Sequence, residues 1–192
     1  MAKRITLFVA VVMFTVALAG CPGPGATPQG TFETYREAVV TKDWNTALGC
    51  LTPESQDKLV AGLVLGLATA SVMNQEAADV LGKHGVDRGE LMGSLVSGAL
   101  SNLMSPRDAL GEGVKRSVET IADRPAFVDD AMRWLETNSP KLADKLFLAG
   151  GAHVSDVEIN GDTATGKLSV PLPGGETSIR FKRISGRWLI DF

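Results

Sequence analysis

Apolar and polar positions recur with two different periods along this chain, and the change falls near Gly151. Before it, apolar residues return every three to four positions, which indicates helices. After it they return at every second position, which indicates strands. The sequence therefore predicts an α+β fold, in which a helical part, residues 31–150, packs on a C-terminal antiparallel sheet, residues 151–192.

Caps and prolines indicate where the first helices begin. We expect one helix capped by Thr31 and ending near Thr41, then a short helix capped by Asp43. The pair Thr52-Pro53 combines a cap with a proline that suits the first helical turn, so it predicts the next start. Residues 59–73 are apolar almost throughout and predict a buried helix.

The rest of the helical part divides at polar and capping residues. Residues 74–88 are more polar and contain two glycines, so we expect a turn there. Residues 89–104 carry an apolar stripe at helical spacing. Further helices are predicted to begin near Ser105, Pro125 and Ser139.

The last part of the chain predicts four strands joined as an antiparallel meander. Turns are indicated at Asn160-Gly161, Pro173-Gly174-Gly175 and Ser185-Gly186. One face of this sheet should be apolar, with Val157, Ile159, Ala164, Gly166, Leu168, Val170, Leu172, Ile179, Phe181, Trp188, Ile190 and Phe192. Such a face must be covered, and the upstream helices are the expected cover.

The start of the chain has the pattern of a secretory signal. Lys3 and Arg4 precede an uncharged apolar run, Ile5–Ala17, and small residues follow it. The run is shorter than the roughly 20 residues that a membrane span needs. Its ending, Leu18-Ala19-Gly20-Cys21, resembles the lipobox of bacterial lipoproteins. The resemblance implies cleavage between Gly20 and Cys21 and acylation of the Cys21 thiol; a plain signal peptide with an incidental cysteine is the alternative.

The lipobox resemblance also sets the expected organisation of the chain. It predicts a signal peptide at residues 1–20, a lipid-anchored Pro/Gly tether at 21–30 and a single α+β domain at 31–192. Two or more acyl chains hold a protein stably on a membrane. An aspartate after the cysteine favours inner-membrane retention in bacterial lipoproteins, and here that position is Pro22. We therefore expect the protein on the outer membrane of the cell envelope, in an extracytoplasmic space.

Several segments resemble the nuclear-transport-factor-two-like superfamily. They are Thr31–Trp44 and Leu51–Ser55 near the start, and Val157–Ala164 and Ile179–Ile190 near the end. The resemblance implies a curved antiparallel sheet wrapped around helices to form a cone with a pocket. Residues 56–150 depart from the family pattern because they are long and helical, so two arrangements stay open: an open pocket, or one filled by the extra helices.

Composition narrows the chemistry. The formal charge is −3, and removing a leader with two basic residues and no acids makes it −5, so nothing suggests nucleic acid as a partner. With Cys21 lipidated, Cys50 has no partner for a disulfide. We expect Cys50 to be a small buried core residue, and a reactive thiol is the alternative.

Few residues are candidates for catalysis or metal binding. The two histidines, His84 and His153, lie far apart in sequence and are expected in turns or on the surface, so neither a metal site nor a cofactor is predicted. A cone-fold enzyme would use a pocket carboxylate as its base, and Asp43, Asp156 and Asp191 are the candidates. Asp43 is better explained as a helix cap, and the other two as solvated residues of the outer sheet face.

Two surface patterns have open explanations. Small residues recur every four positions at Gly85, Gly89, Gly93, Ser97 and Ser101, and again at Gly62, Gly66 and Ala70. Such ladders allow close helix packing, within the chain, with a partner or in a membrane.

A basic stripe on the outer sheet face is expected to be solvated, with a docking surface as the alternative; its members are Lys167, Arg180 and Lys182.

The sequence therefore favours a membrane-anchored, non-catalytic binding or interaction module for a small apolar ligand or another envelope protein. Its site is expected as a pocket or an exposed apolar patch between the sheet and the helices at 59–73 and 91–104. Substituting Leu65 or Leu95 by Asp should then abolish binding. The alternative is a small isomerase or dehydratase of the cone type that uses a pocket carboxylate.

Overall fold

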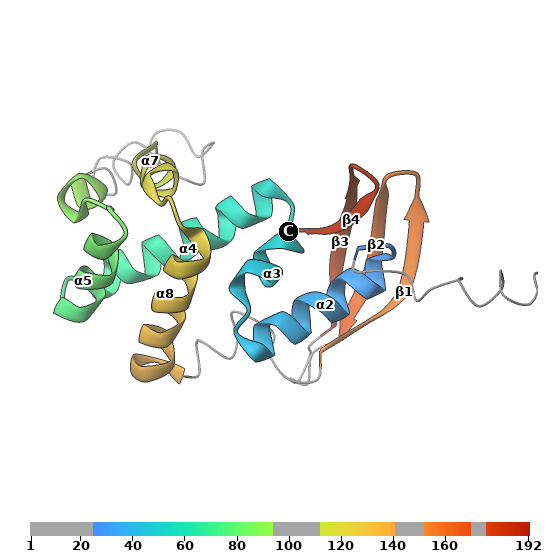
Figure 1. The fold of residues 1–192 in the computed structure, drawn as a ribbon, viewed down its shortest axis with the longest axis horizontal. Helices are drawn as coiled ribbons and strands as arrows, with labels where there is room; N and C mark the ends of the chain where they lie inside the picture. Colours follow the sequence, from blue (N-terminus) through green and yellow to red (C-terminus); the bar gives the residue numbers. More distant parts are fainter. Residues whose placement is uncertain (1–24, 94–111, 141–151, 170–175) are drawn as a thin grey trace, which may run out of the picture.

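The computed structural model describes residues 25–93, 112–140, 152–169 and 176–192. Within them, helices precede one four-stranded antiparallel sheet of order β1-β2-β3-β4, which confirms the predicted α+β fold (Figure 1). The elements are α2 (Pro28–Thr41), α3 (Trp44–Gly49), α4 (Pro53–Ala70), α5 (Gln75–Lys83), α7 (Glu112–Thr120), α8 (Arg124–Asn138), β1 (His153–Asn160), β2 (Thr163–Ser169), β3 (Glu176–Ile184) and β4 (Arg187–Asp191).

The first described helix begins earlier than predicted. Thr27 caps α2 by accepting a hydrogen bond from an amide of the first turn, and Pro28 follows at the position that proline suits. Thr31, predicted to be the cap, lies inside the helix, where its hydroxyl donates to the carbonyl oxygen of Trp188 at 2.9 Å. The carbonyl oxygen of Gly25 also accepts from the Trp188 amide at 2.8 Å. The folded part therefore extends upstream to Gly25.

The sheet buries one face under α2, which lies across it in Figure 1 and contacts β1 and β4. Phe32, Tyr35 and Val39 of α2 are buried. The predicted alternation in the sheet is confirmed by its buried members, which are Ala164, Leu168, Ile179, Phe181, Trp188 and Ile190. Among the described helices, the cover of the sheet is thus provided mainly by α2.

The predicted position of Ile159 in the core is wrong, because its side chain is 59% exposed. The pairing of β1 with β2 shifts register between Ser155 and Glu158, and Asp156 has a left-handed φ of 48°. Such a bulge breaks the simple alternation from which Ile159 was assigned to the core. Because β1 is also an edge strand, the end that carries Ile159 has a neighbouring strand on one side only.

The described turns follow the predicted positions. The turn between β3 and β4 holds Ser185 and Gly186 at φ 51° and 81°, the pair of positive values that a type I′ hairpin requires. Between β1 and β2, Gly161 has φ 60°. The turn predicted at 173–175 lies outside the described residues.

The free edge of β4 is closed by a short segment between α3 and α4. Leu51 forms a parallel bridge with Ile190. The Ile190 amide donates to the carbonyl oxygen of Cys50 at 2.8 Å, and the Thr52 amide donates to that of Ile190 at 2.9 Å. Residues 50–52 therefore extend the sheet by one short parallel segment and fix where α4 begins.

Side chains strengthen the same junction. Thr52 caps α4, as predicted, by accepting from the Ser55 amide, and its hydroxyl contacts a carboxylate oxygen of Asp191 at 3.1 Å. The hydroxyl of Ser55 in turn accepts from the amide of Phe192 at 3.0 Å. The first turn of α4 is therefore held to the end of β4.

Helix α4 is buried on one face rather than all round. Val60, Val64 and Leu67 are fully buried, whereas Leu65 is 38% exposed. The helix runs away from the sheet, and α5, α7 and α8 gather around its far part (Figure 1). No helix among the described residues is long and apolar enough to cross a membrane.

The remaining helices confirm part of the pattern. Residues 74–88 contain helix α5, and the predicted turn follows it at His84 and Gly85. Residues 88–93 are helical, as expected for the start of the 89–104 stripe. The apolar residues predicted for α7 and α8 are buried, namely Val114, Val118, Phe127, Ala131 and Leu135. Gly20, Cys21, Leu95 and the start predicted at Ser105 lie outside the described residues. Ser139 ends α8, and Pro140 after it is helical, as expected for the start of a further helix.

The small-residue ladder is not a helix contact in the described parts of the chain. A Cβ added at Gly62, Gly66 or Gly93 meets no atom within 4 Å. Gly85 lies outside a helix and has φ 77°. Close packing of two helices, the first explanation for the ladder, is therefore not found at these four glycines.

Two glycines have opposite surroundings and predict opposite effects of substitution. In β2, a Cβ at Gly166 would lie 2.9 Å from a Val154 methyl and 3.2 Å from the Ser155 carbonyl oxygen, so Gly166→Ala should cost about 1–3 kcal/mol through overpacking. In α4, Gly66→Ala meets open space and should stabilise by up to about 1 kcal/mol. Urea unfolding of both variants measures this, and equal midpoints would contradict it.

Candidate ligand-binding groove

An apolar groove opens between α4, α2 and the ends of β3 and β4. Its cavity volume is about 460 Å³, within the range of roughly 300–1,000 Å³ usual for small-molecule sites. The lining residues are Tyr35, Lys58, Leu59, Gly62, Leu63, Ile179, Ile190 and Phe192. This is the region between sheet and helices where the sequence predicted a ligand site.

The groove follows from how α4 leaves the sheet. Its first turn is held to β4, but α4 contacts no other strand extensively, while α2 covers the sheet. The space between them is widened by Gly62, which presents no side chain there. A glycine inside a helix costs about 1 kcal/mol relative to alanine, so an open groove is a physical use for this residue.

Tyr35 and Lys58 supply the polar groups of the lining. Tyr35 is only 7% exposed, and no described residue hydrogen-bonds its hydroxyl. Burial, and to a smaller extent the nearby Cys50, raise the pKa of this phenol well above its usual value, so it remains a neutral donor. The ammonium of Lys58 lies 2.8 Å from a carboxylate oxygen of Glu54 and 2.8 Å from the carbonyl oxygen of Phe192.

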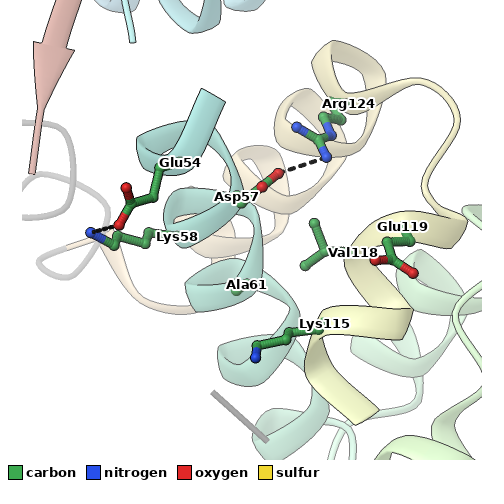
Figure 2. A pocket seen from close by; sticks show the side chains of 8 residues that line it. All are labelled: Glu54, Asp57, Lys58, Ala61, Lys115, Val118, Glu119 and Arg124. Atoms are coloured by element: carbon green, nitrogen blue, oxygen red, sulfur yellow. Dashed lines mark ion pairs between the residues drawn. The ribbon is translucent and has the colours of Figure 1, made fainter. Parts of the chain in front are cut away.

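A second, charged pocket of about 340 Å³ lies between α4, α7 and the start of α8. Figure 2 shows Asp57 turned toward Arg124, with Glu54 and Lys58 together on another side of α4. Asp57 and Arg124 form an ion pair of 2.7 Å. The lining residues are Glu54, Asp57, Lys58, Ala61, Lys115, Val118, Glu119 and Arg124.

The acids of this charged pocket are poorly suited to general base catalysis. The side chains of Glu54 and Asp57 are 73% and 52% exposed. The hydrogen bond and charge of Lys58 lower the pKa of Glu54. A catalytic carboxylate that works near neutral pH usually needs the opposite shift, produced by burial. Glu54 lies in the first turn of α4, and its place in the pocket depends on α7 and α8, which are distant in sequence.

The three carboxylates proposed from the sequence line neither the groove nor the charged pocket. Asp43 caps α3, as predicted, and its hydrogen bonds to Thr46 lower its pKa. Asp156 is exposed and forms an ion pair with Lys167 at 2.8 Å. Asp191 is half-buried and bonded to Thr52, so its prediction as a solvated residue is wrong.

His84 follows α5 in a turn, but its side chain is not on the surface. The ring is 8% exposed, contacts a carboxylate oxygen of Asp130 at 2.8 Å and packs edge-on against Phe127. Lys83 reaches the same oxygen at 2.6 Å. His84 is therefore in a turn, which is one of the two predicted settings, although its side chain is buried, and His153 is exposed. In the described ranges, no cluster of three or more potential ligands could hold a metal ion.

The other candidate positions have ordinary environments. Cys50 is buried and burial raises its pKa, which confirms the prediction of a core residue. The basic stripe lies exposed on the outer face of the sheet at Lys167, Arg180 and Lys182. Leu65 lies on α4, is 38% exposed and does not line the groove.

No protein-family model, curated protein or solved structure matches this chain. The resemblances to bacterial lipoproteins and to the nuclear-transport-factor-two-like superfamily therefore remain predictions from sequence motifs.

The contact between Asp130 and its two basic partners predicts a pH-dependent stability. Lys83 chiefly, and then His84, lower the pKa of Asp130. A carboxyl group whose pKa is lower in the folded protein than in the unfolded one stabilises the fold at pH values above its unfolded pKa. This stabilisation is lost as the pH falls below about 4. We therefore expect Asp130→Asn to cost roughly 1 kcal/mol at pH 7 and progressively less at lower pH.

Chemical unfolding at pH 7, 5 and 3 measures this difference. Glu136→Gln is the matched control, because Glu136 forms a half-exposed ion pair with Lys42 and should change stability by less than about 1 kcal/mol. A constant effect of Asp130→Asn across the whole pH series would contradict the interpretation.

Proposed function

We propose that this protein is a membrane-anchored, non-catalytic binding module of the cell envelope, and that its groove takes an apolar ligand. The observation that carries this proposal is the groove itself. Its lining comes from helix and sheet together, and most of it is apolar. Concave, mainly apolar sites with a few polar groups are the usual form of small-molecule sites.

The energetics favour an apolar occupant. Burying apolar surface yields roughly 25 cal/mol per Å², and the groove offers side chains that the described chain leaves uncovered. Phe192 remains 45% exposed and Leu59 is half-buried. An apolar ligand between α4 and the sheet would cover Phe192 and Leu59. Removing these side chains from water would contribute favourably to the free energy of binding.

The lining favours binding over catalysis. In the part that the structure describes, its side chains include neither a carboxylate nor a histidine, and the titratable ones belong to Tyr35 and Lys58. The isomerase or dehydratase predicted as the alternative needs a pocket carboxylate, and the acids of the charged pocket are largely exposed. The binding module is therefore the better-supported function.

An anchor at Cys21 would hold the groove close to a membrane. The described fold includes Gly25, whose carbonyl oxygen accepts a hydrogen bond from the Trp188 amide. Four residues of extended chain reach roughly 14 Å, so the domain could not move far from an acylated Cys21. A short tether of this kind suits a protein that exchanges an apolar molecule with the lipid phase.

The anchor can be tested by substitution. Cys21→Ala should abolish lipid attachment and release the protein from the membrane fraction, because the thiol is the acceptor that the lipobox resemblance implies. Mass spectrometry of the N-terminal peptide and membrane fractionation measure both effects. Cys50→Ala is the control and should retain the lipid; membrane retention of Cys21→Ala with an unchanged mass would refute the anchor.

The groove can be tested by filling it. Gly62→Phe places an aromatic side chain in the groove, and nothing within 4 Å of an added Cβ opposes it. We expect the affinity for a neutral apolar dye such as Nile red to fall at least about tenfold, which is about 1.4 kcal/mol.

Gly66→Phe is the matched control, since Gly66 has the same open surroundings on α4 but does not line the groove. Fluorescence titration of the dye compares the two variants with the unaltered protein. The groove hypothesis would fail if both variants bound the dye equally well.

A further inference from the structure

We infer that the ligand is a single-chain amphiphile with a carboxylate head, such as a free fatty acid, bound by Tyr35 and Lys58 in the apolar groove. This inference rests on the proposed function and specifies the chemistry of its ligand. It follows from two hydrogen-bond donors that line an otherwise apolar cavity.

The first donor is the hydroxyl of Tyr35. The residue is more than nine-tenths buried, yet no hydrogen bond joins its hydroxyl to any described part of the chain. Among the described residues only the indole nitrogen of Trp134 is a fully buried polar atom without a partner, so the Tyr35 hydroxyl keeps access to solvent. The groove is the solvent-accessible space that Tyr35 lines, so an acceptor on a ligand there would satisfy it.

The second donor is the ammonium of Lys58. It has three hydrogens, and the contacts to Glu54 and to the Phe192 carbonyl oxygen account for two of them. Within the described ranges the third has no partner. A donor that carries positive charge favours an anionic acceptor over a neutral one.

A carboxylate meets the requirements of both donors. Its two oxygens accept several hydrogen bonds and donate none, so one can face the Tyr35 hydroxyl while the other faces Lys58. The raised pKa of Tyr35 keeps its proton on the phenol beside such an anion.

The rest of the groove suits one hydrocarbon chain. Beyond the two donors, it is lined by aliphatic and aromatic side chains and by the open backbone of Gly62. These lining residues come from α2, α4 and the sheet, so the walls lie on several sides. A groove with walls on several sides can enclose the hydrocarbon chain of a single ligand molecule. The flat surface of a bilayer could not enter it.

The test compares two ligands that share a chain and differ in the head group. Calorimetric titration of residues 21–192, with Cys21→Ala so that neither an acyl anchor nor detergent competes, should show dodecanoate binding at least about tenfold more tightly than 1-dodecanol. Both ligands are used as monomers in solution. Lys58→Met should remove this preference while leaving the affinity for 1-dodecanol within about threefold.

Tyr35→Phe keeps the ring and removes the donor, so it should weaken dodecanoate about tenfold without unfolding the protein. Lys42→Met, which alters an exposed ion pair with Glu136, is the control and should change neither affinity. Circular dichroism confirms that each variant is folded.

The outcomes separate the two levels of the proposal. Equal affinity for the two ligands, or a preference unaffected by Lys58→Met, would overturn the carboxylate inference and leave apolar binding standing. Failure to bind either ligand would overturn the proposed function as well. Binding to fatty-acid-containing vesicles without binding of the monomer would overturn the single-molecule site.

Discussion

The structure depends on the junction between residues 50–52 and the edge of β4. Backbone hydrogen bonds join Cys50 and Thr52 to Ile190, and Ser55 holds the amide of Phe192. These bonds satisfy backbone groups that would otherwise be exposed along the edge of the strand. They also fix where α4 begins relative to the sheet. The positions of the helices that pack on α4 therefore depend on these hydrogen bonds as well.

The groove is the consequence of this constraint. Since α4 is tied to β4 by its first turn and then departs, it cannot lie across the sheet as α2 does (Figure 1). Within the described part of residues 56–150, helices α5, α7 and α8 pack around the far part of α4 instead of filling this space. Part of the sheet's apolar face, represented by Ile179 and Ile190, therefore borders an open cavity next to Gly62.

The sequence predicted what depends on local spacing. The order of helices and strands, the apolar sheet face and the caps at Asp43 and Thr52 were readable because each involves residues close together in the chain. The helix start at Pro28 also has a local signal, because Thr27-Pro28 is the same cap-and-proline pair as Thr52-Pro53. The cap was nevertheless predicted at Thr31. The groove was predicted only as a region, because its walls come from Tyr35, α4 and β4.

What could not be predicted involves distant partners. His84 is buried because Asp130, 46 residues away, lies against it. The exposure of Ile159 follows from a bulge at Asp156 that has no signal in the spacing of apolar residues. The apolar pattern of α2 says nothing about a partner for the Tyr35 hydroxyl. Whether that hydroxyl is hydrogen-bonded depends on the neighbouring elements, which are distant in sequence.

An apolar cavity that stays open and holds a lipid-like molecule is the central claim, and native mass spectrometry of the protein extracted gently from its own membranes tests it most directly. The anchor should appear as added mass on Cys21. We expect the protein to carry a further bound mass, equal to that of one single-chain carboxylic acid, that is lost on mild activation. A protein that carries the anchor alone, or that comes out bound to another chain with its groove empty, would contradict the claim.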